Sequence, residues 1–199
     1  AKFHIYMNGK NTQLQPALAL APALYTMQPS GTLYKSMVET GMSTAVESTT
    51  WLDQDFNLVF MGAVYAPNHD AKKVEDALID GVENSQAFTD AELQRIKTIT
   101  QNTADTIAND AAALGSRLSD YAVSSHGQWD QYFKDLQAIQ DLKLNDANQI
   151  LKQFLVSSHR ISGDIQPTPE DQKKAMTLKA QDKPKTLDQS AEKPEPLKD

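Results

Sequence analysis

The sequence contains no cysteine among its 199 residues. Disulfide bonds, thiolate metal sites, iron–sulfur clusters and cysteine nucleophiles are therefore excluded. No apolar run approaches the roughly 20 residues that a membrane-spanning helix needs. The most apolar run, 17–24, is interrupted by Pro22 and lacks the basic leader typical of a signal peptide. These absences are compatible with either the cytoplasm or the periplasm.

An excess of positive charge is also lacking, because 26 acidic side chains oppose 19 basic ones and give a formal charge of −7. Without a basic patch to displace counterions from phosphates, nucleic acid is not an expected partner. The hydrophobic content of 40% suits a globular core. A chain of this length can hold one domain, with or without an extended tail.

Histidine patterns that bind metal are missing. None of the four histidines lies within five residues of another, and no His-x-x-Glu-His or His-x-x-x-His pair occurs. We therefore expect all four to be structural or surface residues, and we predict no metal-ligating residue in this chain. The histidines are His4, His69, His126 and His159.

Other catalytic patterns are absent as well. There is no Gly-x-Ser-x-Gly nucleophile elbow and no phosphate-binding glycine loop. Asp53 and Asp55 could form an acid pair or a calcium ligand set, but a solvated turn is the favoured interpretation. No catalytic residue is predicted, and the substrate-binding residues are unknown.

Hydrophobic periodicity predicts four strands and six helices. The Asp53-Gln54-Asp55 turn favours an antiparallel pair of strands on either side of it. The second strand of that pair is apolar on both faces, which predicts helices on one face and more protein on the other. The expected strands are 2–7, 44–51, 56–65 and 160–165, and the expected helices are 16–27, 33–41, 70–84, 93–121, 129–140 and one entered at 144–145.

This order predicts an α+β fold, with helices packed on one face of a mainly antiparallel sheet. The helix at 93–121 is expected to run for about nine turns. Thr89 and Glu92 form a capping box before it, and Gly115 could bend it. Its charged side chains, Lys97 included, are expected to be solvated. Trp129, Tyr132 and Phe133 share one side of the next helix, where core packing is favoured over partner binding.

The composition changes after Gln166. The segment 167–199 has no aromatic residue, five prolines, and lysines alternating with acidic residues. Too little apolar surface is available there to offset about 1–2 kcal/mol of backbone ordering per residue. The expected organisation is a folded domain at 1–166 and a Pro/Lys/Glu-rich linker or disordered tail at 167–199. A short helix over 169–179, capped by Thr168, is the alternative for part of that tail.

Four segments, in order along the chain, resemble part of the pitrilysin/insulinase family of zinc peptidases. The longest, ALALAPALYTMQPSGTLYKSMVETGMSTAVES (17–48), follows the family pattern of a small-residue helix, a Gly/Ser turn, Leu-Tyr-Lys, Val-Glu, a glycine and a strand. The likeness covers roughly 16–170, and each motif is weak alone but the ordered set is more specific. The other three are Thr89-Asp90-Ala91-Glu92-Leu93, His126-Gly127-Gln128-Trp129, and Arg160-Ile161-Ser162-Gly163 followed by Pro167-Thr168.

The resemblance implies a LuxS/metallopeptidase-like half-domain, one of two similar subdomains in a unit that faces a second unit. The first subdomain of the family carries the His-x-x-Glu-His motif, which is absent here. Some members carry an Arg and a Tyr in the opposing unit at positions that match Val38 and Thr44 of this chain. Because this chain lacks that Arg and Tyr, the resemblance favours the second subdomain of the first unit over the opposing unit. Such a subdomain is expected to be inactive by itself.

The resemblance further implies that the parent protein is a zinc-dependent metalloendopeptidase, in which a zinc-bound water attacks a peptide carbonyl. This chain would support the zinc-bearing subdomain and wall part of the peptide chamber, with zinc held by the parent and none in this chain. Expected partners are the zinc-bearing subdomain, the opposing half and the peptide substrate. Bacterial relatives with this layout are often exported, so a periplasmic location is expected, with the cytoplasm as the alternative.

Two alternatives stay open. The chain could be a non-catalytic binding or assembly subunit of a peptidase-like complex, since family members without the zinc motif serve as structural or regulatory partners. It could also be an unrelated α+β protein, in which the turn and helix at 29–41 need not pack against the strand at 56–65. A His-x-x-Glu-His motif encoded roughly one subdomain upstream of Ala1 would favour the peptidase.

Overall fold

The computed structural model describes residues 1–9, 11–66, 69–168 and 171. The chain divides into two units, Ala1–Ile165 and Gln166–Asp199, and every helix and strand below belongs to the first. The predicted tail lies outside the described residues except for Pro167, Thr168 and Asp171. The Thr168 hydroxyl donates to Asp171 Oδ2 over 2.6 Å, and the Asp171 amide donates back to Thr168 Oγ1 over 3.2 Å. The rest of the predicted helix at 169–179 also falls outside.

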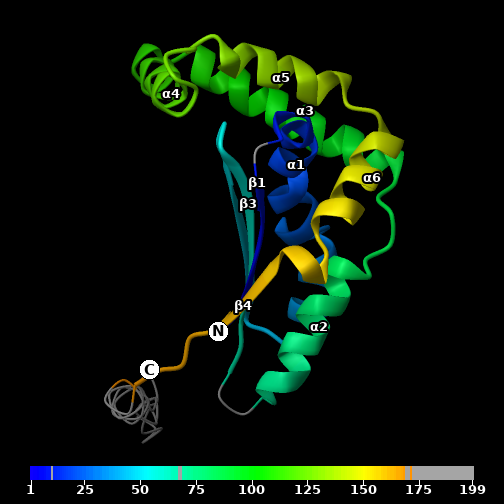
Figure 1. Ribbon diagram of the computed structural model, residues 1–199. Coiled ribbons are helices and arrows are strands. Elements are labelled where there is room, and N and C mark those ends of the chain that lie inside the picture. The colour runs from blue at the N-terminus through cyan, green and yellow to red at the C-terminus, as the bar shows by residue number, and fades with distance from the viewer. Residues whose placement is uncertain (10, 67–68, 169–170, 172–199) are drawn as a thin grey trace, which may run out of the picture. The chain divides into compact units, whose positions relative to one another are not determined.

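Four antiparallel strands form one sheet in the order β2-β3-β1-β4 (Figure 1). All four strands were expected from the sequence, and so was the antiparallel pairing of β2 with β3. The first strand is longer than predicted, because Asn8 pairs with Asn57 and Gly9 with Phe56 instead of ending it. The strands are β1 (Lys2–Gly9), β2 (Ala45–Leu52), β3 (Phe56–Val64) and β4 (Arg160–Asp164).

Most of the α-helices lie on one side of this sheet, and α4 lies beyond its upper end in the view of Figure 1. This arrangement confirms the predicted α+β class. The α-helices are α1 (Gln15–Thr26), α2 (Ala71–Glu83), α3 (Asp90–Ala108), α4 (Ala111–Ser124), α5 (Gln131–Asp141) and α6 (Leu144–Phe154). Short helical turns η1 (Thr12–Leu14), η2 (Tyr34–Val38) and η3 (Ser157–His159) complete the described elements.

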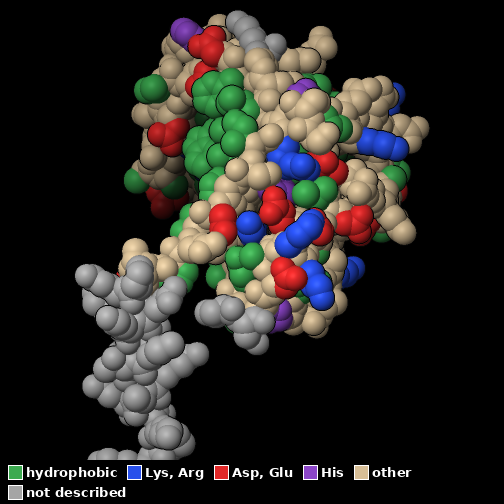
Figure 2. All heavy atoms as spheres, turned by 60° about the horizontal axis from the view of Figure 1, so that its bottom comes forward, with side chains coloured by type: hydrophobic (Ala, Val, Ile, Leu, Met, Phe, Trp, Pro, Cys, Tyr) green, Lys and Arg blue, Asp and Glu red, His purple; other side chains and the backbone are tan. Residues whose placement is uncertain are grey.

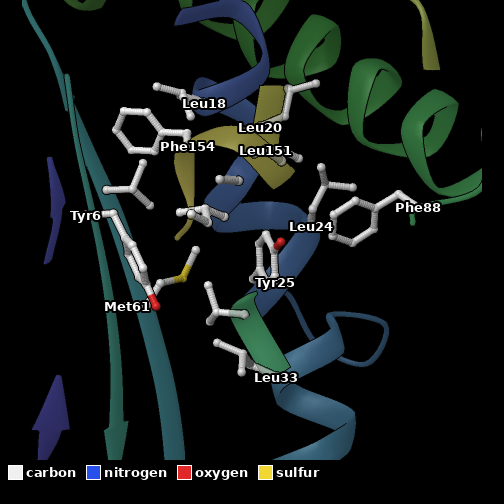
Figure 3. Close-up of a cluster of buried hydrophobic side chains, with 14 of the residues drawn as sticks. Tyr6, Leu18, Leu20, Leu24, Tyr25, Leu33, Met61, Phe88, Leu151 and Phe154 are labelled. Atoms are coloured by element: carbon white, nitrogen blue, oxygen red, sulfur yellow. The ribbon is translucent and has the colours of Figure 1, made fainter. Parts of the chain in front are cut away.

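Helix α1 is the centre of the core. It packs on β2 and β3 with one side and on α3, α5 and α6 with others. Its small alanines allow this close approach, and six of its residues are buried: Ala17, Leu18, Leu20, Ala21, Leu24 and Tyr25. Figure 3 shows its leucines among Tyr6 and Met61 of the sheet and Leu151 and Phe154 of α6.

The segment after α1 joins the same core. Leu33 and Met37, which flank and belong to η2, are fully buried in one cluster with Val59 and Met61 of β3. The chain turns away after η2 at Gly41, whose φ of 75° favours glycine. Helix η2 packs on β2 and α2 and shares the core cluster with β3, as the peptidase resemblance requires and as an unrelated fold would not require.

The predicted long helix at 93–121 is wrong, because the chain forms two helices there. Helix α3 ends at Ala108 and α4 begins at Ala111. Asp110 has an extended conformation, and its carboxylate accepts from the amides of Ala112 over 2.9 Å and Ala113 over 3.1 Å. This N-cap starts a new helix, so the break lies at 109–110 and not at Gly115. The capping box at the start of α3 is confirmed.

Lys97 of α3 is buried, although it was expected to be solvated. Its ammonium group donates to the carbonyl oxygens of Gln140 over 2.8 Å and Leu142 over 2.5 Å. These carbonyls end helix α5, where acceptors lack partners within the helix. The cation therefore fixes the end of α5 against α3, and a favourable interaction with the helix dipole accompanies the two hydrogen bonds.

Asp110→Ala is expected to lower the free energy of unfolding by about 1 kcal/mol, since two amides of α4 lose their acceptor. In one continuous helix the same change would instead add a better helix former and raise stability. Denaturant unfolding of the variant shows whether its free energy of unfolding falls or rises. Gly115→Ala is the matched control, because an added methyl group meets nothing within 4 Å. It should stabilise the protein by about 0.5–1 kcal/mol.

Candidate functional site

The residues that the sequence offers for metal binding stay apart. Within 1–9, 11–66, 69–168 and 171, no three His, Asp or Glu side chains lie together as a metal site would require. His4 is buried on β1, His69 precedes α2, and His126 is exposed after α4. His159 directs Nδ1 at the carbonyl oxygen of Phe154, 2.9 Å away. That the chain lacks catalytic and metal-ligating residues stays a prediction.

The acidic turn between β2 and β3 is used locally. The amide of Asp55 donates to Asp53 Oδ1 over 3.3 Å, and the side chain of Gln15 donates to the carbonyl of Asp53 over 2.8 Å. Asp53 thus shapes the turn with its side chain and anchors α1 with its backbone. Nothing in this geometry points to a calcium site or an acid pair.

The three aromatic residues near α5 divide between the core and the surface. Tyr132 is buried and contacts Tyr121 and Phe133 edge-on. Trp129 and Phe133 are 54% and 47% exposed. Core packing, expected for all three, therefore holds only for Tyr132.

The sheet has one apolar face that the helices do not cover. Side chains alternate along each strand, so His4, Tyr6 and Met61 point to the helices while their neighbours point away. Figure 2 shows hydrophobic side chains gathered on this side, and Figure 1 shows the α-helices on the other. We call this surface the open sheet face, and its apolar members are Phe3, Ile5, Met7, Trp51, Phe56, Leu58, Phe60, Val64 and Ile161.

The open sheet face is most exposed at Trp51 and Ile161, which are 53% and 55% accessible. At its centre the rings of Phe3 and Phe60 stack with centroids 5.7 Å apart and planes 25° from parallel. Phe3 lies opposite Gly163 on β4, where an added Cβ would come within 2.1 Å of the ring. Glycine therefore lets the ring lie flat on the sheet, and the result is a smooth apolar surface.

Comparison with solved structures gives the same fold in peptidases. The inactive peptidase domain of a candidate zinc protease from Bordetella parapertussis aligns with 26% identity and a TM-score of 0.74, over 84% of this chain and 92% of that one. A protease from Helicobacter pylori aligns with 18% identity and a TM-score of 0.71, over 83% and 41%. The periplasmic protease PqqL from Escherichia coli aligns with 14% identity and a TM-score of 0.52, over 84% and 19%. No protein-family model and no curated protein sequence matches the chain.

The resemblance to the pitrilysin family is confirmed. The chain has the fold of an inactive peptidase domain of M16-like zinc proteases. It spans less than half of the Helicobacter and Escherichia chains. An inactive domain of this type therefore has at least one partner domain in its larger relatives. No helix within the described part of the chain is long and apolar enough to cross a membrane.

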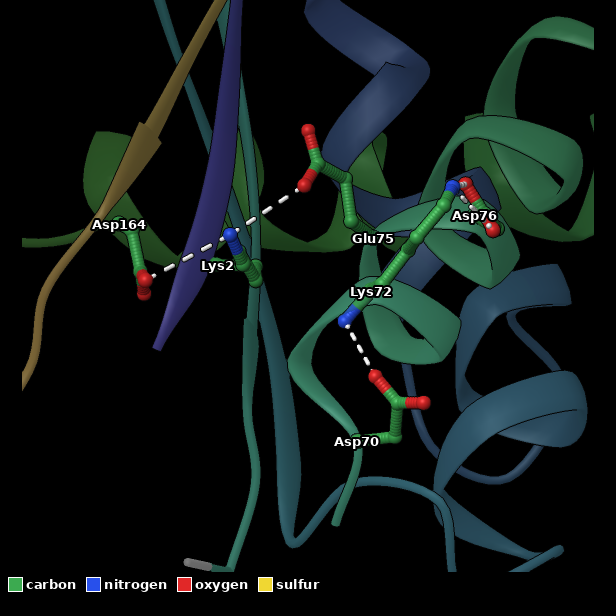
Figure 4. Close-up of polar contacts among 6 residues, drawn as sticks. All are labelled: Lys2, Asp70, Lys72, Glu75, Asp76 and Asp164. Atoms are coloured by element: carbon green, nitrogen blue, oxygen red, sulfur yellow. Dashed lines mark hydrogen bonds and ion pairs between the residues drawn. The ribbon is translucent and has the colours of Figure 1, made fainter.

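Within the described part of the chain, a set of partly buried charges ties α2 to the sheet. Tyr6 of β1 donates to Glu83 Oε1 over 3.0 Å, and Arg160 of β4 pairs with the same oxygen. Further along, Lys2 lies between Glu75 and Asp164, with its nitrogen 3.2 and 3.5 Å from their oxygens (Figure 4). Opposite charges that share these contacts offset part of their desolvation cost. The arrangement is that of a structural tie.

His4 sits inside this tie. Its Nδ1 is 3.5 Å from the Tyr6 hydroxyl, and its buried Nε2 has no hydrogen-bond partner. Burial lowers the pKa of His4 to about 4, and the nearby positive charge of Arg160 acts in the same direction. Burial and the Glu83 carboxylate, in contrast, raise the pKa of Tyr6. Both side chains are therefore neutral at physiological pH.

Protonation of His4 should destabilise the folded unit in mild acid. The pKa of His4 is 6.5 in the unfolded chain and about 4 in the folded one. The contribution of neutral His4 to the free energy of unfolding is therefore fully present above pH 6.5 and is lost as the pH falls towards 4. The full shift corresponds to about 3 kcal/mol. His4→Gln should flatten the pH dependence of the unfolding free energy in this window. A slope as steep as that of the control His69→Gln would contradict the assignment.

Proposed function

We propose that this chain is the non-catalytic domain of a zinc-dependent metalloendopeptidase, in which it supports the zinc-bearing domain and walls part of the peptide chamber. The open sheet face is the observation that carries the proposal. Its nine apolar side chains form a contiguous surface, and such surfaces on soluble proteins mark sites of interaction. The likeness to an inactive peptidase domain supports a peptide or a peptidase domain as what meets that surface.

The zinc chemistry belongs to the partner domain in this proposal. The described residues bring together no ligand set for a metal, and no reaction step is assigned to them. Its contribution is a fixed apolar wall. Trp51, Met7 and Phe56 belong to residue types that are enriched at protein interfaces, where they bury large apolar side chains.

The proposed location is the periplasm, with the cytoplasm as the alternative. Support comes from the fold shared with a periplasmic protease. The lack of cysteine is compatible with both compartments.

The proposed role of the open sheet face can be tested by substituting two tryptophans of nearly equal exposure. Trp51 lies on the face, and Trp129 lies outside it. The test uses the complete protein that contains this chain and the zinc-bearing domain. Trp51→Thr should lower kcat/KM for a quenched fluorescent peptide about tenfold, the effect of losing one interface anchor. Trp129→Thr should leave it unchanged.

Thermal unfolding checks that both variants are folded. If both are, and the two substitutions change kcat/KM equally, the proposed role of the open sheet face is refuted. A complete protein that assembles with a peptidase but cleaves nothing would favour the alternative of a non-catalytic assembly subunit. Circular dichroism of the variants separates either outcome from misfolding.

The isolated chain is expected to take up no stoichiometric zinc and to cleave no peptide, because its histidines lie apart. Metal analysis after dialysis against zinc measures the first, and a casein digest measures the second. One zinc per chain that disappears in His126→Ala or His159→Ala would contradict the proposal. The same chain with the zinc-bearing domain added is the positive control for cleavage.

A further inference from the structure

Helix α4 is packed less tightly than the helices beside it. None of its 14 residues is buried, although Leu114, Leu118 and Tyr121 recur at helical spacing along one side. The helix contacts α3 and α5 beyond the end of the sheet (Figure 1). Ile99 of α3 is 36% exposed. Packing between these three helices is therefore incomplete.

A hollow of about 340 Å³ lies where α3, α4 and α5 meet. We call it the α4 hollow. Its volume falls at the lower end of the range of small-molecule sites, about 300–1,000 Å³. Most of the side chains that line it are apolar, as in such sites. The apolar members include Ala19, Ile99, Ala104, Ile107, Leu136 and Ile139.

Two polar groups that line the α4 hollow lack a partner in the described part of the chain. Arg117 of α4 forms no ion pair or hydrogen bond there. Tyr132 of α5 is only 6% exposed, and its buried hydroxyl has no hydrogen-bond partner. A buried hydroxyl without a partner is unfavourable, so a ligand atom that accepts its proton would remove that penalty.

The charges around the α4 hollow favour an anion. Of the residues that line it, Arg117 alone is charged. Asp120 and Asp135 line the adjoining hollow instead. Asp135 accepts from Gln131 over 2.7 Å, and burial together with the Asp135 carboxylate raises the pKa of Tyr121 to about 12. Asp135 is thus engaged with its own neighbours, while the guanidinium of Arg117 is available to a carboxylate.

We propose that the α4 hollow binds a small monocarboxylate with an apolar tail. The guanidinium of Arg117 and the hydroxyl of Tyr132 donate hydrogen bonds to the carboxylate. The tail packs on Ile107, Leu136 and Ile139 and is removed from water there. The proposal uses only this chain and does not depend on its proposed role in a peptidase.

The probe is 4-methylpentanoate, titrated into the full chain by isothermal calorimetry. We expect saturable binding with a Kd below about 1 mM. The uncharged isostere 4-methylpentanamide should bind at least about tenfold more weakly, because hydrogen bonds to a charged acceptor are stronger. Acetate keeps the carboxylate and lacks the tail, so it should show no saturable binding up to about 10 mM.

Two substitutions test the two donors. Arg117→Gln should lower the affinity for 4-methylpentanoate at least about tenfold and leave the affinity for the amide unchanged. Lys134→Gln is the matched control, because it removes a positive charge from α5 at a residue that does not line the hollow. It should change neither affinity. Tyr132→Phe should weaken binding of the acid about fivefold.

Thermal unfolding without ligand checks that each variant is folded. The melting temperature of Tyr132→Phe should not fall, since the hydroxyl it loses has no partner among the described residues. Equal affinities for the acid and the amide, or undiminished binding of the acid by folded Arg117→Gln, would overturn the proposal. No saturable binding of 4-methylpentanoate up to about 10 mM would overturn it as well.

Discussion

Burial of helix α1 between the sheet and the outer helices is the contact on which the rest of the structure depends. Six of its twelve residues are buried, and they touch both layers. Each large apolar side chain so buried contributes roughly 1.5–3 kcal/mol. Helix α1 therefore cannot move without opening contacts to the sheet and to α3 and α6 together. The ion pairs of Lys2 and Glu83 then fix α2 on the same sheet, at sites where misplacement would leave partly buried charges unpaired.

The same contact leaves the sheet unequal on its two sides. One face is closed by α1, α2 and α6, and the other exposes Trp51 and Phe56. Both faces are apolar in β3, so the sequence of that strand is suited to two covered sides. The open sheet face is thus a surface on which apolar side chains of the described residues stay exposed.

Sequence periodicity was sufficient for the four strands and for most helices, but not for the division of 93–121 into two helices or for long-range contacts. The strands, the capping box at Thr89, and the buried stripe of Val74, Leu78 and Val82 all depend on local patterns, and the structure contains them. The break at 109–110 was missed because apolar spacing continues through it, and only the Asp110 cap reveals it. Burial of Lys97 could not be predicted, since its acceptors come from the end of α5. The hollow that Thr50 and Leu52 line could not be predicted for the same reason, because residues of α1, β2, α4 and α5 form it together.

An exposed apolar face has a physical cost that argues for its use. Water contact with apolar side chains is unfavourable by about 25 cal/mol per Å², and contiguous patches promote association. The formal charge of −7 counteracts association through repulsion but does not remove that cost. The glycine at 163 makes the face flatter without improving the packing of the helix layer, since Phe3 lies on the opposite side from α1. A surface shaped in this way gains stability only when something lies against it, and this reasoning holds independently of the likeness to peptidases.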